Sequence, residues 1–362
     1  MIIYLWTHDA NGLYSRQKII DNATSVIWRH DYQGAGYFEL YIRATAEMLS
    51  FFRTADVMLT KDGDSRPMFA ESVKLTTSFE DGDYLTITGR SAECILERRI
   101  LREQTMLTGK AEVVLRNLII DNFLAQIPAN RYVPYMAVGV LKNYTETVNR
   151  QATGKDILTI CEDICKEQNY GFKIYKSGDY LVFEVYKPTD RSYGQTDNPR
   201  VVFSTAFENL GNTEYSYDAS AYRNCMYVAG EGEGSNRVIV QVGTNAAGLA
   251  RREKWVDARN SSSTTSGGTL TPTEYRAQLR EQGLEEIAVH NVAEVFSGEV
   301  ISDIYRYGID YELGDLVAVE NEYGLKGSAQ VTAITEVEDG EGYRIYPTLS
   351  DWTIYSEEED DD

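Results

Sequence analysis

The segment Val73-Lys-Leu-Thr-Thr-Ser-Phe-Glu-Asp-Gly82 recurs in outline as Val331-Thr-Ala-Ile-Thr-Glu-Val-Glu-Asp-Gly340. Each segment lies between two shorter strand-like runs, which are Asp56–Leu59 and Tyr84–Thr88 in the first copy and Asp315–Val319 and Tyr343–Tyr346 in the second. The opening aspartate precedes the aspartate of the Asp-Gly pair by 25 positions in the first copy (56 to 81) and by 24 in the second (315 to 339), so the copies align almost without a gap.

The alternating apolar and polar positions predict three antiparallel strands in each copy, with a tight hairpin at the Asp-Gly pair. Asp and Gly tolerate the positive φ that such hairpins require. A chain that builds one barrel-like unit twice is typical of a ring-forming protein, because few subunits then present many equivalent units. The alternative is that Glu-Asp-Gly is simply a common hairpin sequence, and the repeat alone does not decide between the two.

The composition predicts a soluble globular protein of two to four domains. The chain has 362 residues, and its 43% hydrophobic and 25% charged residues are ordinary values for such proteins. No apolar run approaches the roughly 20 residues needed to cross a bilayer. Residues 1–9 lack the basic segment and cleavage site of a signal peptide and resemble a first strand, so we expect a protein made in the cytoplasm without a membrane span.

The net charge of −21 argues against a sequence-specific grip on nucleic acid, because neutralising phosphates requires an excess of Lys and Arg. An acidic surface can instead line a passage through which a polyanion slides without sticking. The most acidic stretch, Ser356–Asp362, is expected to be a disordered, solvated end.

Cysteines and histidines are too few and too dispersed to predict a zinc site. Only Cys161 and Cys165 are close together, at helical i, i+4 spacing. We therefore expect buried free thiols. The residues concerned are Cys94, Cys161, Cys165, Cys225, His8, His30 and His290.

The changes of period along the chain predict an α+β, mainly β protein with two antiparallel β-barrels. The expected divisions are a first barrel at 1–103, an α+β domain at 104–197, a second barrel at 198–242 and 298–354, an insertion with a Ser/Thr/Gly loop and a helix at 243–297, and an acidic tail at 355–362. In the insertion, residues 260–268 are expected to form an exposed loop.

Four helices are expected from apolar periodicity and capping residues. Ser91–Leu101 is predicted to be a short helix, and Thr108 to cap a helix that contains Val114 and Phe123. Thr153-Gly-Lys-Asp156 resembles a capping box, and its helix is expected to end near Asn169-Tyr-Gly171. Thr271-Pro-Thr-Glu274 combines an N-cap, a proline at N1 and a glutamate at N3.

No pattern of catalytic, cofactor-binding or metal-binding residues stands out, so the chain is not expected to be an enzyme. Gly230-Glu-Gly-Glu-Gly234 superficially resembles a phosphate-binding loop, but its carboxylates would repel phosphate and a tight turn is favoured. With 56 acidic residues, pairs of carboxylates occur throughout the chain and do not indicate a glycosidase. No serine lies in a Gly-x-Ser-x-Gly elbow, which a serine hydrolase of that class would need. The basic clusters Arg98-Arg99 and Arg251–Lys254 are interpreted as solvated or subunit-contacting faces.

The order of several soft motifs resembles the Gp-type siphovirus tail proteins, which are related to the tail-tip or baseplate hubs of phages and injection machines. The resemblance covers roughly Ile3 to Asp351. The motifs are Gly36–Leu40, Leu85–Arg90 with Ile95-Leu96 and Arg99-Ile100, Thr153–Asp156, Arg223-Asn224 with Gly230–Gly234, and Tyr311–Val317.

The resemblance implies a non-enzymatic structural protein of the virion tail, made in the host cytoplasm and assembled as a homotrimer. Two tail-tube-like barrels per chain would give a pseudo-sixfold ring that joins a hexameric tail-tube or distal tail protein to a tail fibre or spike. DNA or a tape-measure protein would pass through the channel without specific binding. Two alternatives stay open: a virion-associated glycan or peptidoglycan hydrolase, and a carbohydrate-binding adhesin.

Overall fold

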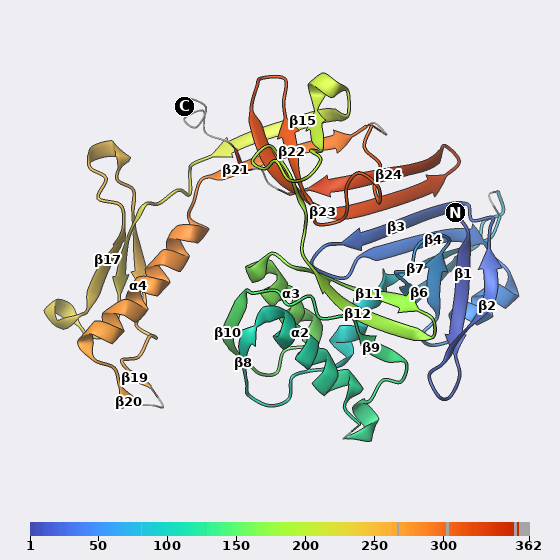
Figure 1. Cartoon of the computed structure of the whole chain (residues 1–362), viewed down its shortest axis with the longest axis horizontal. Helices are drawn as coiled ribbons and strands as arrows, with labels where there is room; N and C mark the ends of the chain where they lie inside the picture. The colour runs from blue at the N-terminus through green and yellow to red at the C-terminus, as the bar shows by residue number, and fades with distance from the viewer. Residues whose placement is uncertain (81, 127, 266–267, 302–303, 351–352, 355–362) are drawn as a thin grey trace. The chain divides into compact units, whose positions relative to one another are not determined.

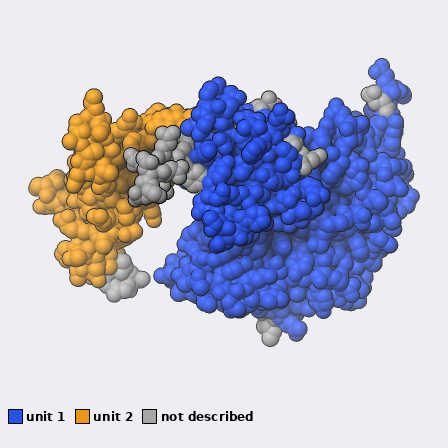
Figure 2. All heavy atoms as spheres, turned by 45° about the horizontal axis from the view of Figure 1, so that its top comes forward, with its two compact units in different colours: residues 1–213, 298–362 blue, residues 214–297 orange. Residues whose placement is uncertain are grey.

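The computed structural model describes residues 1–362 except 81, 127, 266–267, 302–303, 351–352 and 355–362 (Figure 1). The chain divides into two compact units (Figure 2). Unit 1 comprises residues 1–213 and 298–362, and unit 2 comprises residues 214–297. Strands predominate, which confirms the prediction of an α+β, mainly β protein.

The N-terminal part of unit 1 is an antiparallel sheet whose alternating side chains cover one core. In β3 and β4 the inward positions include Val26, Trp28, Phe38 and Leu40, which are almost fully buried. The strands are β1 (Ile3–His8), β2 (Tyr14–Ile20), β3 (Ser25–Asp31), β4 (Tyr37–Arg43), β5 (Met58–Lys61), β6 (Met68–Thr76) and β7 (Tyr84–Ser91). Helix α1 (Ala46–Phe52) lies between β4 and β5, capped by Thr45.

Both repeat copies form the predicted three-stranded antiparallel unit. In the first copy β5 pairs with β6 and β6 with β7. In the second, β22 (Leu316–Glu320) pairs with β23 (Lys326–Asp339), which pairs with β24 (Gly342–Leu349). In each copy the middle strand has one bulge near the start of its pairing with the third strand.

The hairpins differ in detail from the prediction. In the second copy the positive φ lies at Gly342 (+117°) rather than at the Asp-Gly pair, and the Asp339 carboxylate accepts a hydrogen bond from the Glu341 N–H. In the first copy the connection is longer, from Thr76 to Tyr84, and Asp81 lies outside the described residues.

Strand β23 connects the two copies into one sheet. Its first half pairs with β22, and its second half pairs with β24 on one side and with β3 on the other. The strand order is β13-β22-β23-β3-β4-β7-β6-β5-β1-β2. No pairing among the described residues joins the two ends of this order, so the two closed barrels expected from the sequence are not observed. The second copy uses β3 as a partner instead of closing on itself.

Short strands complete the C-terminal part of this sheet. β13 (Asp190–Arg191) and β14 (Val202–Ser204) pair in parallel with β22, and β25 (Thr353–Ile354) pairs with β23. η4 (Thr205–Phe207) follows β14. β15 (Leu210–Asp218) and β21 (Ala293–Val300) form a separate two-stranded sheet.

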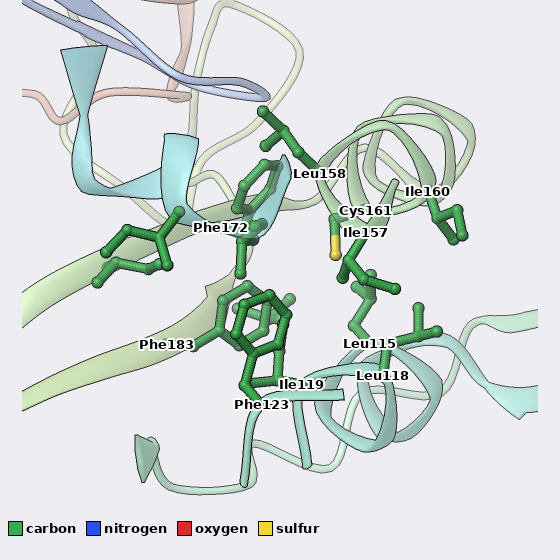
Figure 3. Packing of buried hydrophobic residues seen from close by; sticks show 14 of the residues in the cluster. Leu115, Leu118, Ile119, Phe123, Ile157, Leu158, Ile160, Cys161, Phe172 and Phe183 are labelled. Carbon is green, nitrogen blue, oxygen red and sulfur yellow. The ribbon is translucent and has the colours of Figure 1, made fainter. Parts of the chain in front are cut away.

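The middle of unit 1 is an α+β region around an aromatic core. Figure 3 shows Phe123, Phe172 and Phe183 packed against the apolar faces of α2 and α3. The elements are η1 (Ala92–Arg98), β8 (Thr105–Lys110), α2 (Ala111–Ile119), a π-helical turn η2 (Ile120–Leu124), η3 (Ala129–Arg131), β9 (Met136–Val138), β10 (Thr147–Ala152), α3 (Ile157–Gln168), β11 (Gly171–Ser177) and β12 (Tyr180–Tyr186).

Local capping explains where the helix predictions succeed and fail. The segment predicted as a helix from Ser91 is a 3₁₀ helix. Thr108 does not cap α2, because it lies in β8 and its hydroxyl bonds to Asn149 (3.0 Å). The N-cap of α3 is Asp156 rather than Thr153, the first residue of the predicted capping box, because the Asp156 carboxylate accepts from the Thr159 N–H. The helix ends within the predicted segment 169–171, with Asn169 rather than glycine in the left-handed conformation, at φ +50°.

Unit 2 consists of a small sheet covered by one helix. The sheet order is β17-β16-β18, from β16 (Cys225–Ala229), β17 (Ile239–Gly243) and β18 (Glu253–Asp257). Helix α4 (Pro272–Val289) packs Tyr275 and Leu279 on the sheet. The remaining elements are η5 (Gly234–Asn236), η6 (Gly248–Ala250), β19 (Thr264–Thr265) and β20 (Gly268–Thr269).

Two features of unit 2 differ from the sequence expectation. The compact unit begins at residue 214, whereas the expected insertion begins at 243, because β16 and β17 pair with β18 rather than with the strands of the second copy. The expected exposed loop at 260–268 includes the short strand pair β19–β20.

Candidate functional site at the junction of the two β units

Charged side chains from both repeat copies gather at one junction within unit 1. Lys61 ends β5, and Asp64 follows it in the loop to β6. Glu336 comes from β23, and His30 from β3, the strand that pairs with β23. Lys61, His30 and Glu336 are buried although each is ionisable. Burial of such groups is costly unless they are paired, so their contacts define the site.

The contacts form a continuous network. The Lys61 ammonium forms an ion pair with Glu336 and lies 3.6 Å from the Asp64 carboxylate. His30 Nε2 is 3.0 Å from Asp64 Oδ2, and the Arg66 backbone N–H donates to Asp64 Oδ1 at 2.8 Å. Glu336 also accepts a hydrogen bond from the Tyr343 hydroxyl of β24. One lysine therefore contacts a carboxylate from each copy.

The pKa values of Asp64 and of two titratable residues near the network, Tyr307 and Glu312, shift in opposite directions. Burial opposes ionisation of Asp64, but the His30 hydrogen bond and the Lys61 charge hold its pKa well below the ordinary value. Burial, together with the charges of Glu312 and other carboxylates, raises the pKa of Tyr307 to about 12 despite the opposing charge of Arg66. Burial, reinforced by Asp315, also raises the pKa of Glu312.

An open cavity of about 700 Å³ adjoins the network. It is lined by Met1, Ile2, Lys61, Asp62, Gly63, Asp64, Tyr307, Gly308, Glu312, Glu336, Glu338, Tyr343 and Ile345. Glu338 forms an ion pair with the amino group of Met1. Most of its charged groups are acidic, so the cavity favours cationic or hydroxyl-rich groups over anions.

The opening aspartates of the two copies each pair with an arginine, although Asp56 is 34% exposed and Asp315 only 3%. Asp56 forms an ion pair with Arg98 at 2.6 Å, and Asp315 forms one with Arg191 at 2.8 Å. Asp315 is buried and accepts further hydrogen bonds from the backbone N–H groups of Thr189 and Glu312. An arginine thus fixes the start of each repeated unit.

The motifs considered as candidate sites have structural roles. Gly230–Gly234 forms the turn between β16 and β17, where the Gly230 N–H donates to the Val238 carbonyl. Arg98 pairs with Asp56, and Arg99 stacks on Phe123.

The second basic cluster is held by side chains of unit 2. Arg251 pairs with Glu253, and Lys254 pairs with Glu286 at 2.7 Å. Arg252 stacks on Tyr222.

All four cysteines are free and buried, as predicted. Cys161 and Cys165 lie one turn apart on α3, whereas Cys94 and Cys225 lie in η1 and β16. Within the described ranges, no group of three His, Cys, Asp or Glu side chains is arranged to hold a metal ion. No helix of the described part combines the length and the apolar character needed to span a bilayer.

The sequence did not identify the junction residues. Lys61 and Asp64 are three residues apart, but Glu336 lies 275 positions after Lys61 (61 to 336), and the β23–β3 pairing is needed to bring its strand into the same sheet. The available signal is Glu336 itself, a charged residue on the inward face of a strand that otherwise buries apolar side chains.

By fold, the chain is similar to phage tail proteins of known structure. It is similar to the tail protein from Neisseria meningitidis MC58, with 13% identity, a TM-score of 0.55 and 96% of each chain covered. It is also similar to the 43 kDa tail protein of prophage MuSo2 from Shewanella oneidensis, with 12% identity, a TM-score of 0.55 and 97% and 98% coverage. Prophage tail protein gp18 from Listeria monocytogenes EGD-e shows 13% identity, a TM-score of 0.51 and 96% and 94% coverage.

The sequence matches the family described as Siphovirus ReqiPepy6 Gp37-like protein over residues 2–349. The chain therefore belongs to this family of siphovirus tail proteins, which confirms the resemblance found in the sequence. No curated protein sequence matches it.

Proposed function

We propose that the chain is a structural hub of the phage tail tip or baseplate, where it joins the tail tube to the tip. Membership in a siphovirus tail protein family supports a place in the virion tail and assembly with other tail proteins. The observation that carries the proposal is the duplicated β unit. In both β5–β6–β7 and β22–β23–β24 the middle strand pairs antiparallel with the strand before it and the strand after it, and both lie in one continuous sheet.

Two such units in each chain allow three identical chains to present six. The proposed assembly is a homotrimer that forms a pseudo-sixfold ring, with each unit in the place of one tail-tube barrel. The ring contacts a hexameric tube or distal tail protein on one side and a fibre or spike on the other. The net charge of −21 supports passage of DNA or a tape-measure protein through the channel, because carboxylates repel phosphate.

The junction network supports a fixed relation between the two repeated β units, which both lie in unit 1. A ring with sixfold appearance requires that relation to be rigid, and the buried Lys61–Glu336 pair together with the β23–β3 strand pairing restrains it. The role of this site in the proposal is structural.

Native mass spectrometry over a range of concentrations, combined with negative-stain imaging, tests the proposal. A trimer mass together with threefold rings that have a central hole supports the hub. A monomer or a dimer as the largest species contradicts the homotrimer.

The second candidate function is glycan or peptidoglycan hydrolysis at the acidic cavity. The specific observation is that Glu312 and Asp64 line one cavity while burial raises the pKa of the first and the network lowers that of the second. Glycosidases use a protonated acid beside an ionised carboxylate. A zymogram with the full chain and with Glu312→Gln separates the functions: clearing that is lost in Glu312→Gln supports hydrolysis, and no clearing by either contradicts it.

A further inference from the structure

A cluster of arginines lies at the start of the α+β region of unit 1. It comprises Arg98, Arg99, Arg102 and Arg131, here called the arginine patch. Within the described residues, only Arg98 forms an ion pair, with Asp56 at 2.6 Å. A compact group of positive charges is unusual on a chain whose net charge is −21.

The other arginines bond to neutral groups. Arg99 Nε and Nη2 each lie 3.3 Å from the Arg131 carbonyl oxygen. Arg131 Nη2 donates to the Ile100 carbonyl at 3.1 Å and to Asn122 Oδ1 at 2.9 Å. Burial lowers the pKa of Arg131, and the nearby charges of Arg102 and Arg99 lower it further. Carbonyl and amide groups hold these side chains in place but do not neutralise their charges.

An apolar cavity of about 240 Å³ adjoins the patch. Its lining includes Phe69, Phe123, Val133 and Pro134, together with Arg99, Arg98 and the Asp56 carboxylate that pairs with Arg98. An apolar cavity of about 150 Å³ is large enough for benzene. The cavity is therefore large enough for one aromatic ring, and the unpaired arginine charges of the patch lie next to it.

We infer that the arginine patch and its cavity bind the acidic C-terminal segment of a neighbouring copy of this chain, residues 355–362. This segment, Tyr-Ser-Glu-Glu-Glu-Asp-Asp-Asp, places an aromatic residue before six consecutive acids and is the densest run of negative charge in the sequence. Charge-assisted bonds between arginine and carboxylate are among the stronger polar contacts in proteins. A contact between two different surfaces of the same chain is the kind that closes a ring, so the inference rests on the proposed assembly.

A fluorescent peptide of residues 353–362 tests this contact by anisotropy. The receptor is the full-length chain with a neutral tail, in which Glu357, Glu358 and Glu359 become Gln and Asp360, Asp361 and Asp362 become Asn. Arg102→Glu is expected to weaken binding about tenfold or more, because Arg102 is exposed and forms no ion pair or hydrogen bond with the described residues. Arg53→Glu is the matched control: it reverses an exposed arginine outside the patch and leaves binding unchanged.

The peptide variant Tyr355→Ser tests the cavity and is expected to bind several-fold more weakly. Thermal unfolding checks that each receptor variant is folded, and Arg102→Gln replaces Arg102→Glu if the latter is not. Absence of peptide binding, or equal binding by the wild-type patch and the Arg102 variant, overturns the inference. So does a patch-dependent complex with another tail protein when the peptide itself does not bind.

The oligomeric state separates this inference from the hub proposal. If the neutral-tail and native chains both form trimers and the peptide does not bind, the tail contact is wrong and the hub stands. If the peptide binds through Arg102 while the native chain stays monomeric at all concentrations, the tail contact stands and the homotrimer is wrong.

Discussion

Lys61 of the first β unit and Glu336 of the second form an ion pair whose side chains are only 9% and 6% exposed. The same ammonium lies 3.6 Å from Asp64 Oδ2, and His30 Nε2 lies 3.0 Å from the same oxygen. A single cation therefore contacts two carboxylates where the repeated β units meet. Such buried pairs contribute little net stability, but removal of one partner leaves an uncompensated charge.

Lys61→Met is expected to lower the free energy of unfolding of unit 1 by about 3 kcal/mol, because it leaves Glu336 and Asp64 without their cation. Urea denaturation measures the change. Lys74→Met, at an exposed position of β6, is the control and is expected to change stability by less than about 0.5 kcal/mol. The double variant Lys61→Met/Glu336→Leu is expected to recover part of the loss. Equal stabilities of Lys61→Met and Lys74→Met would contradict the role of the pair.

Asp64 is expected to make the stability of unit 1 depend on acid pH. Its pKa is lower in the folded chain than its ordinary value of 3.8, so the folded state binds its proton less readily than the unfolded state. Its stabilising contribution is therefore complete above the unfolded-state pKa and is lost as pH falls below it through the folded-state pKa. Asp64→Asn is expected to flatten the stability profile from pH 5 downwards, measured by urea denaturation at each pH. Asp62→Asn, at an exposed neighbouring position, should retain the native slope.

The repeated unit could be predicted because its information is local. Alternation of apolar and polar residues specifies strands, and the spacing from Asp315 to Asp339 specifies which strands are consecutive. The partner of the second half of β23 could not be predicted. β3 precedes β23 by about three hundred positions, and any strand with an apolar face satisfies the same pattern. The expectation of closed barrels failed at this step, and the charged junction was missed for the same reason.

Helix starts show the same division between local and distant information. Thr271 caps α4 as predicted, because its partner Glu274 lies three residues away. Thr108 was wrongly expected to cap α2, because its strand pairs with β10 and its hydroxyl bonds to Asn149. Capping residues are reliable signals only where no strand partner from elsewhere competes for the same backbone.

Thr271→Ala is expected to destabilise α4 of unit 2 by about 1 kcal/mol. The Thr271 side chain accepts from the Glu274 N–H at 3.3 Å, and the Glu274 carboxylate accepts from the Thr271 N–H at 2.8 Å, so the substitution removes one half of a reciprocal cap. Hydrogen exchange of the amides of α4 measures the loss. Thr273→Ala, at the second residue of the helix, is the control. Equal exchange in the two variants would exclude the capping role.

The four thiols are expected to be unreactive in the native chain. Each is buried, and burial raises the pKa of Cys94 to about 12 and those of Cys161 and Cys165 above their ordinary range. Because the thiolate is the reactive form, Ellman's reagent at pH 8 should react about a hundredfold more slowly with the native than with the denatured chain. Rapid reaction of one thiol in the native chain would show that its element opens readily.

Gly314 and Gly324 give a matched test of the start of the second β unit. Both have positive φ, +99° and +80°, so alanine at either position is strained by about 1 kcal/mol. A Cβ at Gly314 would lie 2.3 Å from the ring of Tyr32, whose hydroxyl bonds to the Asn169 carbonyl and is thus held in place, whereas a Cβ at Gly324 meets no atom within 4 Å. Gly314→Ala is therefore expected to cost about 2 kcal/mol more than Gly324→Ala in urea denaturation. Similar losses in the two variants would mean that Tyr32 can move aside, and that this contact does not hold the second β unit of unit 1 against β3.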